Sequence, residues 1–312
     1  MSRRTPRLFA AALAVGALLL GGCAEKTSND TPAVGGSSAA AAFPVSVGKL
    51  TLDKRPEKIV SLSPSATEML FAIGAGKQVT AVDDNSNYPA EAPKSDLSGF
   101  QPNAEAIAGK SPDLVVLSND TNKIVDQLTT LKIPVLLTPA AATLDDTYQQ
   151  LTDLGKLTGH PAEADAVTKK MKDDIAALTK DLPQRAKKLT YYHELGPELY
   201  SATSKTFIGS IYALAGLENI ADPADADGKN GGYPQLSQEV IVKANPDFVF
   251  LADTKCCKQT PETVKARSGW AGVTAVKNNQ IVGLDDDIAS RWGPRVVDLL
   301  KAIVDATAKV PA

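Results

Sequence analysis

One short pattern occurs twice in the chain and constrains the fold more than any other feature. The segments NAEAIAGKSPDLVVLS (103–118) and SQEVIVKANPDFVFLA (237–252) both read Glu-x-Ile, four further residues, Pro-Asp, and an apolar run. The first part is typical of a short helix, Pro-Asp of the turn that ends it, and the apolar run of a buried strand. The repetition predicts that one small α/β unit is built twice.

Strand and helix signals alternate around both copies of this pattern. Strand-like runs at 58–63, 78–83, 113–118 and 134–138 are separated by helical segments at 65–76, 104–108, 123–132 and 144–158. The alternation restarts with LTYYHEL and continues to a final helix that starts at Pro294. Strands that are apolar nearly throughout and separated by helices predict mainly parallel sheets covered on both faces.

One long amphipathic segment separates the two runs of alternation. Residues 161–184 carry apolar side chains at helical spacing, with Pro161 at the start and Pro183 near the end. The folded body therefore divides into an N-terminal α/β lobe (43–160), this connecting helix (161–184) and a C-terminal α/β lobe (185–312). We predict an α/β fold of two Rossmann-like lobes joined by one long α-helix.

The N-terminus has the features of a bacterial lipoprotein signal. Three arginines precede the apolar run LFAAALAVGALLL, which is too short to span a membrane. LGGC (20–23) resembles a lipobox, which implies a signal peptide at 1–22 and lipidation of Cys23; the alternative is a plain secretory signal with an incidental cysteine. Residues 23–42 are small and polar and predict a flexible tether. We expect a body anchored by lipid to the membrane, outside the cytoplasm.

Several function classes lack the residues they need. The net charge of −3 gives no field that attracts nucleic acid, and the motifs of common hydrolases, dinucleotide enzymes and metalloproteases do not occur. His160 and His193 are too few and too far apart for a free zinc or manganese site. We predict neither an enzyme nor a resident cofactor. Cys256 and Cys257 are adjacent, and either a strained vicinal disulfide or two thiols would suit them.

Several motifs, in this order, resemble the substrate-binding proteins of ABC importers for vitamin B12, ferric siderophores and haem. They are RPEKIVSLSPSATEMLFAIGAGKQVTAVDD (55–84), NYP (87–89), the first Glu-x-Ile and Pro-Asp pattern (105–113) and RWGPR (291–295). The resemblance runs from about Arg55 to Ala308. It implies two α/β lobes joined by a rigid helix, a ligand cleft between the lobes, and a permease dimer with its ATPase subunits as partners.

The resemblance also assigns site residues. The branch that binds vitamin B12 places aromatic side chains and one acid–arginine pair around its ligand, at positions that correspond here to Tyr88, Phe100, Tyr200, Tyr233, Asp287 and Arg291. Trp292 is a further aromatic candidate, whereas Trp270 is expected to pack in the core. Glu105 and Glu239, the acids of the repeated pattern, correspond to the glutamates that dock on permease arginines, where charge pairs steer approach and fix register.

The expected ligand is a large metal chelate. Flat aromatic side chains suit a bulky planar molecule, and an acid–arginine pair can hydrogen-bond its amide or carboxylate arms. Cobalamin or another corrinoid is the first choice, and a ferric siderophore or haem is the alternative. Ser118 stands where this branch carries a tryptophan, which leaves room for a more polar pocket. A free-metal receptor or an enzyme on the same fold are more distant possibilities.

Overall fold

The computed structural model describes residues 42–311. The expected signal peptide (1–22), the lipidation site Cys23 and nearly all of the tether therefore lie outside the described residues. Within the part that is described, no helix is both long and apolar enough to cross a membrane. These residues belong to one compact unit, in which we call residues 42–160 the N-terminal lobe and residues 180–311 the C-terminal lobe. The exact lobe boundaries stay a prediction.

The N-terminal lobe is built on a parallel sheet with the strand order β4-β3-β5-β6. Its strands are β3 (Ile59–Leu62), β4 (Val79–Val82), β5 (Leu114–Leu117) and β6 (Val135–Leu137). Its helices are α1 (Pro64–Ala72), α2 (Ala104–Ala108), α3 (Ile124–Thr130) and α4 (Leu144–Thr158), with 3₁₀ turns η1 (Ala75–Gln78) and η2 (Thr121–Lys123). An antiparallel hairpin of β1 (Val45–Val47) and β2 (Leu50–Leu52), which the sequence did not predict, precedes them.

The C-terminal lobe repeats this sheet with the order β10-β9-β7-β8. Its strands are β7 (Thr190–Glu194), β8 (Glu218–Asn219), β9 (Phe248–Leu251) and β10 (Ile281–Gly283). Its helices are α6 (Phe207–Leu214), α7 (Gln238–Ala244), α8 (Pro261–Lys265), α9 (Thr274–Lys277), α10 (Asp286–Ser290) and α11 (Val296–Thr307), with η3 (Asp222–Asp225) and η4 (Trp270–Gly272). When the four strands of each sheet are counted in chain order, both sheets have the order 2-1-3-4. The second strand therefore flanks the first on one side, and the third and fourth follow on the other side. The α/β fold and the duplicated unit are thus confirmed.

The Pro-Asp turns of the repeat make the same contact in both lobes. Asp113 Oδ2 accepts hydrogen bonds from the backbone N–H groups of Glu57 and Lys58, at 2.9 and 3.0 Å. Asp247 Oδ2 accepts one from the N–H of Thr190 at 2.8 Å. Each carboxylate therefore reaches across to the start of the neighbouring strand. Asp113 and Asp247 thus favour the predicted turn and, through these hydrogen bonds, also connect the turn to the neighbouring strand.

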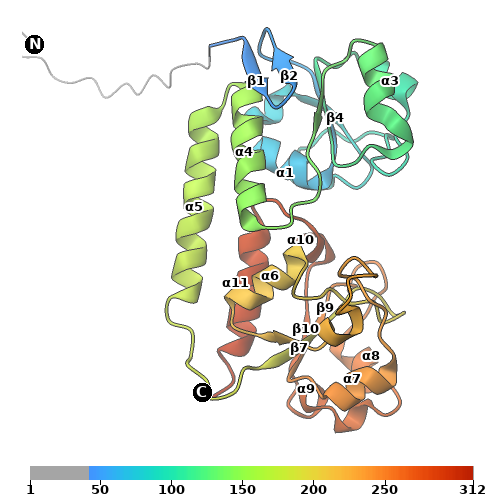
Figure 1. Cartoon of the computed structure of the whole chain (residues 1–312), viewed down its shortest axis with the longest axis vertical. Helices are drawn as coiled ribbons and strands as arrows, with labels where there is room; N and C mark the ends of the chain where they lie inside the picture. The colour runs from blue at the N-terminus through green and yellow to red at the C-terminus, as the bar shows by residue number, and fades with distance from the viewer. Residues whose placement is uncertain (1–41, 312) are drawn as a thin grey trace, which may run out of the picture. The chain divides into compact units, whose positions relative to one another are not determined.

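The long connecting helix α5 (Pro161–Thr179) lies beside α4 and also packs against α11 (Figure 1). It ends before the predicted residue 184 because Pro183 lacks an N–H group and disfavours a helical conformation at the residue before it. Similarly, α1 ends before the predicted residue 76, since Gly74 takes up a left-handed conformation with φ +83°. The remaining predicted elements differ from the observed ones by one or two residues at their ends.

Three buried clusters form the core. The largest runs from the sheet of the N-terminal lobe through α4, α5 and α11 to the sheet of the C-terminal lobe, and each lobe has a second cluster of its own. Trp270 is fully buried in the second cluster of the C-terminal lobe, which confirms its packing role. The shared cluster makes the connecting helices part of one continuous apolar core.

Candidate functional site

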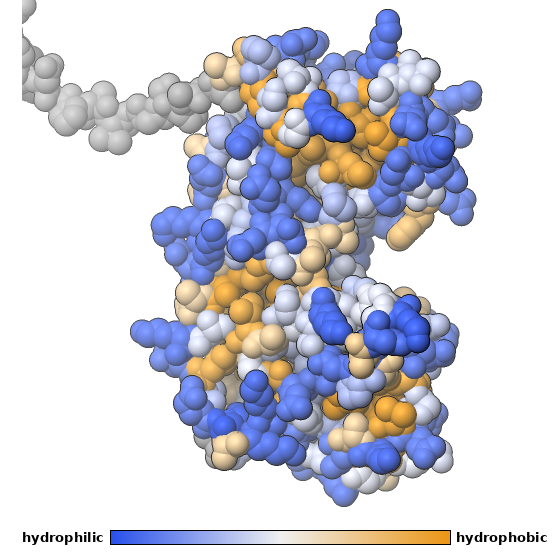
Figure 2. Space-filling view, viewed as in Figure 1, coloured by the Kyte–Doolittle hydropathy of each residue, from blue (hydrophilic) through white to orange (hydrophobic). Residues whose placement is uncertain are grey.

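The loops that follow the parallel strands carry most of the candidate site. Asn87 and Tyr88 follow β4, Lys255 follows β9 and Asp287 follows β10. Ligands of open α/β sheets bind outside the carboxyl ends of such strands. The Asn87 Nδ2 amide donates to Asp287 Oδ2 at 3.1 Å, so the carboxyl edges of the two sheets meet across the lobes at this point. Figure 2 shows the surface hollowed between the two lobes.

The four aromatic residues assigned from the sequence are the exposed aromatic side chains of the described part of the chain. Their exposed fractions are 45% for Tyr88, 73% for Phe100, 45% for Tyr200 and 43% for Tyr233. Large aromatic side chains are usually buried in a core or in an interface. Four that remain open to solvent and are carried on strand-end loops are available to cover a flat apolar molecule.

Tyr200 and Tyr233 lie on two segments that pair with each other. Tyr200 and Gln235 form an antiparallel bridge, and the N–H of Ser201 donates to the carbonyl of Pro234 at 3.0 Å. The loop before Tyr233 is fastened by the buried Asp225, whose carboxylate accepts from the N–H groups of Asn230 and Gly232 at 2.7 and 2.6 Å. These bonds give both tyrosines fixed backbones, although both side chains are exposed.

The predicted acid–arginine pair forms between Asp287 and Arg291, which are four positions apart in the chain. The NH2 group of Arg291 donates to Asp287 Oδ1 at 2.8 Å. The same guanidinium donates to the carbonyl of Asn85 at 3.0 Å and, through NH1, to Glu68 Oε1 at 2.9 Å. Only 9% of the Arg291 side chain is exposed. Three of its five N–H donors are therefore bound by the protein, and its predicted contact with a ligand stays a prediction.

A lysine that the sequence reasoning missed completes this pair. The Nζ of Lys255 lies 2.8 Å from a carboxylate oxygen of Asp287 and equally close to one of Asp285. Burial alone would raise the pKa of Asp287, but the hydrogen bond from Lys255 and the charge of Arg291 hold that pKa below its usual value. Asp287 is thus an ionised acceptor between two cations. The position of Lys255, just after a central parallel strand, is the signal that could have identified it.

The sequence also left unassigned two charged side chains, Glu68 and Arg295, which lie on the side of Arg291 away from Asp287. Glu68 on α1 is almost fully buried and binds both Arg291 and Arg295. The guanidinium carbon of Arg295 lies 3.9 Å from the centroid of the Tyr88 ring. An acid inside the apolar run SATEMLFA was the available signal, because a buried carboxylate needs a charged partner. The arginines of RWGPR, four residues apart, are these partners.

Trp292 has its polar groups bound by the N-terminal lobe. Its indole N–H donates to Gln150 Oε1 at 3.0 Å, its backbone N–H to Ser65 Oγ at 3.2 Å, and its carbonyl accepts from Thr147 Oγ1 at 3.0 Å. The side chain is half-buried against the shared core. The structure gives Trp292 a role in joining the lobes, and its ligand contact stays a prediction.

The two candidate docking glutamates occupy matching positions. Glu105 is the second residue of α2 and Glu239 the second residue of α7, and both are exposed. The helices begin with similar caps, since Asn103 accepts from the N–H of Ala106 and Ser237 from that of Val240. An acid in the first turn is favoured by the helix dipole, which suits both positions without further partners.

His193 lies apart from this site, whereas the two cysteines directly follow Lys255 in the chain. His193, on β7, is fully buried and bonds Tyr212 at 2.8 Å, so it is a core residue. Burial lowers its pKa to about 4. Cys256 and Cys257 are free thiols, and partial desolvation together with the neighbouring Cys257 and Asp286 raises the pKa of the exposed Cys256 to about 12. A reactive thiolate is therefore disfavoured at Cys256.

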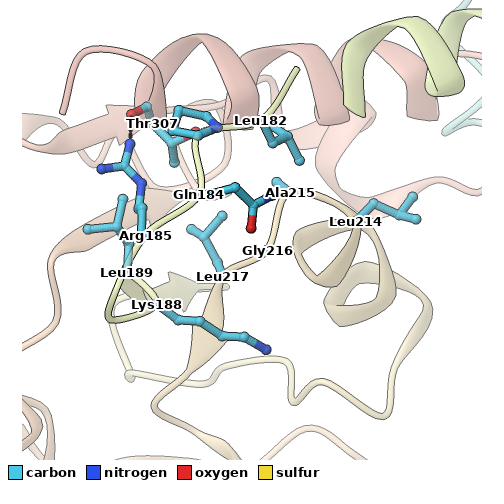
Figure 3. A pocket seen from close by; sticks show the side chains of 11 residues that line it. Leu182, Gln184, Arg185, Lys188, Leu189, Leu214, Ala215, Gly216, Leu217 and Thr307 are labelled. Carbon is cyan, nitrogen blue, oxygen red and sulfur yellow. Dashed lines mark hydrogen bonds between the residues drawn. The ribbon is translucent and has the colours of Figure 1, made fainter. Parts of the chain in front are cut away.

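A separate pocket opens where the chain leaves α5 (Figure 3). Its lining includes Leu182, Lys188, Leu189 and Leu217, and its volume of about 230 Å³ is below the roughly 300–1,000 Å³ of most small-molecule sites. Arg185 at its edge donates to the carbonyl of Thr307, the last residue of α11, and to that of Val310, which follows the helix. This pocket contains none of the predicted ligand residues, and its arginine has a structural role.

Comparison with known proteins identifies the family. Residues 59–288 match the model of the family described as periplasmic binding protein. The match covers more than half of the chain. The chain belongs to the periplasmic binding protein family. This confirms the resemblance seen in the sequence, and members of the family are binding proteins rather than enzymes.

Individual relatives agree with this placement. The chain is 34% identical over 266 residues to the cobalamin-binding protein of Halobacterium salinarum, covering 82% of this chain and 71% of the relative. It is 29% identical over 315 residues, 95% of each chain, to the uncharacterized ABC transporter substrate-binding lipoprotein YvrC of Bacillus subtilis. A solved possible iron-binding protein of Staphylococcus epidermidis superposes with a TM-score of 0.70 and 28% identity, covering 82% of this chain and all of the other. The two-lobed fold is thus that of this family.

Proposed function

We propose that this chain is the lipid-anchored, extracytoplasmic substrate-binding protein of an ABC importer and that its ligand is a corrinoid. The family and the name of the Bacillus subtilis relative support the transport role and the anchor. The name of the Halobacterium salinarum relative supports the corrinoid. The chain would capture the chelate and deliver it to the permease, while the ATPase subunits supply the energy.

The observation that carries the proposal is the set of four exposed aromatic side chains on the loops of the two lobes. Tyr88 and Phe100 belong to the N-terminal lobe, and Tyr200 and Tyr233 to the C-terminal lobe. Aromatic side chains bury a large area with little loss of conformational freedom. A planar macrocycle bound between the lobes would cover them from both sides.

The charge balance of the site favours a neutral, amide-rich ligand. Each of the three basic side chains at the site, Lys255, Arg291 and Arg295, already pairs with at least one carboxylate. An anionic chelate would have to displace these carboxylates or bind beside them, and unpaired buried charges are costly. The amide arms of a corrinoid can instead hydrogen-bond the exposed atoms of Asn87, Asp287 and Lys255 without changing the net charge.

One observation favours the alternative, a ferric siderophore or haem. The Lys255 side chain is 52% exposed, so it can turn from Asp287 towards an anionic ligand. The name of the Staphylococcus epidermidis relative, a possible iron-binding protein, points in the same direction. A carboxylate-rich chelate bound mainly through Lys255 would keep the transport role and change the cargo.

Isothermal titration calorimetry on residues 24–312 tests the choice. The ligands are cyanocobalamin, haemin, a neutral ferric hydroxamate and anionic ferric citrate. Saturable binding of cyanocobalamin alone, weakened by Asp287→Ala and unchanged by salt, would support the corrinoid. Binding of haemin or ferric citrate alone, weakened by Lys255→Ala and by salt, would assign the protein to iron or haem uptake. Binding of none of the four would remove the chelate proposal.

A further inference from the structure

Among the described residues, Glu68 is the acid that forms ion pairs with both arginines of the RWGPR segment. Its side chain, only 2% exposed, accepts from Arg291 NH1 at 2.9 Å and from Arg295 NH2 at 2.5 Å, both on Oε1. Its Oε2 accepts from Arg295 Nε at 3.0 Å. The close approach needs Gly293, where a Cβ would lie 3.2 Å from Oε2. A single carboxylate of the N-terminal lobe thereby holds two cations of the C-terminal lobe.

The first cation leads to the acid of the candidate site. The guanidinium of Arg291 is planar, so fixing NH1 on Glu68 also fixes the direction of NH2. That second nitrogen donates to Asp287 Oδ1 at 2.8 Å. Asp287 in turn accepts from Lys255 Nζ at 2.8 Å and from Asn87 Nδ2 at 3.1 Å. Glu68 is therefore linked through one residue, Arg291, to Asp287 at the polar centre of the cleft.

The second cation leads to an exposed aromatic. Arg295 binds Glu68 through Nε and NH2, and its guanidinium carbon lies 3.9 Å from the centroid of the Tyr88 ring. Burial alone would lower the pKa of Arg295, but the hydrogen bond and charge of Glu68 raise it. A cation held permanently over an aromatic face fixes the orientation of that ring.

We propose that Glu68 is a positioning residue for the ligand cleft. It orients Asp287 through Arg291 and Tyr88 through Arg295, and so sets the distance between an acid of one lobe and an aromatic ring of the other. This inference rests on the proposed function to the extent that Asp287 and Tyr88 contact the ligand. The geometry of Glu68 and its two arginines does not depend on what that ligand is.

The test compares Glu68→Gln with Glu57→Gln, a change at an exposed glutamate of the same lobe. Cyanocobalamin affinity is measured by calorimetry well below the melting temperature, and amide hydrogen exchange is measured on the ligand-free proteins. We expect Glu68→Gln to raise the Kd at least tenfold and to speed exchange at 85–89 and 285–295. Glu68→Asp, which restores the charge one methylene short, should recover part of the affinity. Glu57→Gln should match the wild type in both measurements.

Each result decides a separate claim. Unchanged Kd and exchange in Glu68→Gln would overturn the proposal, and so would faster exchange with unchanged affinity, because the network would then be merely structural. If wild-type protein binds no cyanocobalamin, the corrinoid assignment fails on its own, and the exchange comparison alone decides whether Glu68 holds the two segments. If Glu68→Gln does not fold, Arg295→Lys replaces it. That change keeps the charge but loses the flat contact with Tyr88, and normal affinity would then contradict the inference.

Discussion

Glu105 and Glu239 occupy the same place in the two lobes, each as the second residue of a short helix that leads through a Pro-Asp turn into the third strand of its sheet. The strand orders of the two sheets are the same, so the two acids stand at equivalent points of a duplicated unit. A homodimeric partner presents two equivalent surfaces, and a duplicated binder can place one acid on each.

Replacing both acids with alanine should abolish uptake and leave ligand affinity unchanged, because charge pairs at a rim act on encounter and register. Each single change should leave partial uptake. Cells that carry the permease and ATPase would be assayed for accumulation of labelled ligand. Glu262→Ala is the matched control, since Glu262 is also an exposed acid in the first turn of a short helix. Normal uptake by the double variant would refute the docking assignment.

Cys23→Ala should release the protein from the membrane. An acyl-anchored chain binds the membrane through its lipid, so loss of the acylated cysteine should remove the anchor. Fractionation of expressing cells, followed by immunoblotting of membrane and soluble fractions, measures the release. Cys256→Ala, which changes an exposed thiol of the folded body, controls for the loss of a cysteine. Retention of the Cys23 variant in the membrane fraction would disprove the anchor.

Tyr200→Ala and Tyr233→Ala should each weaken ligand binding by about tenfold, which corresponds to about 1.4 kcal/mol of lost contact. The phenylalanine variants should bind nearly as well as wild type, since the ring face rather than the hydroxyl is expected to cover the ligand. Calorimetry gives both affinities. Leu131→Ala, at another exposed apolar side chain, is the control. A larger loss in the phenylalanine variants would indicate a hydrogen bond instead.

Asp253 should make folding stability depend on pH. It is fully buried, and its carboxylate oxygens have no hydrogen-bond partner among the described residues. Burial and the neighbouring charge of Glu194 raise its pKa to about 7, with the charge of Arg267 opposing them. Between its ordinary pKa near 3.8 and this value, the folded protein binds more protons than the unfolded chain. The free energy of unfolding therefore falls as the pH rises through this range.

Asp253→Asn replaces the titratable carboxyl group with an amide and should therefore remove the fall in the free energy of unfolding. Relative to wild type, the variant should gain stability between pH 5 and pH 8, by up to about 1.4 kcal/mol for each unit of pKa shift in that range. Urea unfolding at four pH values between 5 and 8 measures the difference. Asp165→Asn, at an exposed position on α5, should give a difference that does not change with pH. A constant difference for Asp253→Asn as well would mean that Asp253 does not titrate in this range.

Most of the fold could be predicted from local patterns. The range of α4 was predicted as observed, since its apolar spacing is clear and Thr143 and Asp146 form a capping box. The strands of the N-terminal sheet were predicted within one residue at each end because buried parallel strands are continuous apolar runs, whereas the two-residue β8 was missed. The β1–β2 hairpin was missed, since its strands have three residues each and no strong turn signal. Short elements such as these form only through tertiary contacts.

The site was predictable where a side chain is exposed and less so where it is buried in a network. The four aromatic residues were assigned by position, and all four are open to solvent. Glu68, Lys255 and Arg295 were missed because their roles depend on partners more than 30 residues away in the chain. Pattern analysis of a local window shows an odd charge in an apolar helix but not the distant cation that neutralises it.

The segment that contains Arg291 and Trp292 has a mechanical consequence. It leaves β10 of the C-terminal lobe and bonds α1 and α4 of the N-terminal lobe, at a different place from the connecting helix α5. Two bodies joined at a single point can turn about any axis through it. Bodies joined at two separate points keep only the hinge axis that runs through both. A relative rotation of the lobes that keeps both connections is therefore confined to the axis that runs through them.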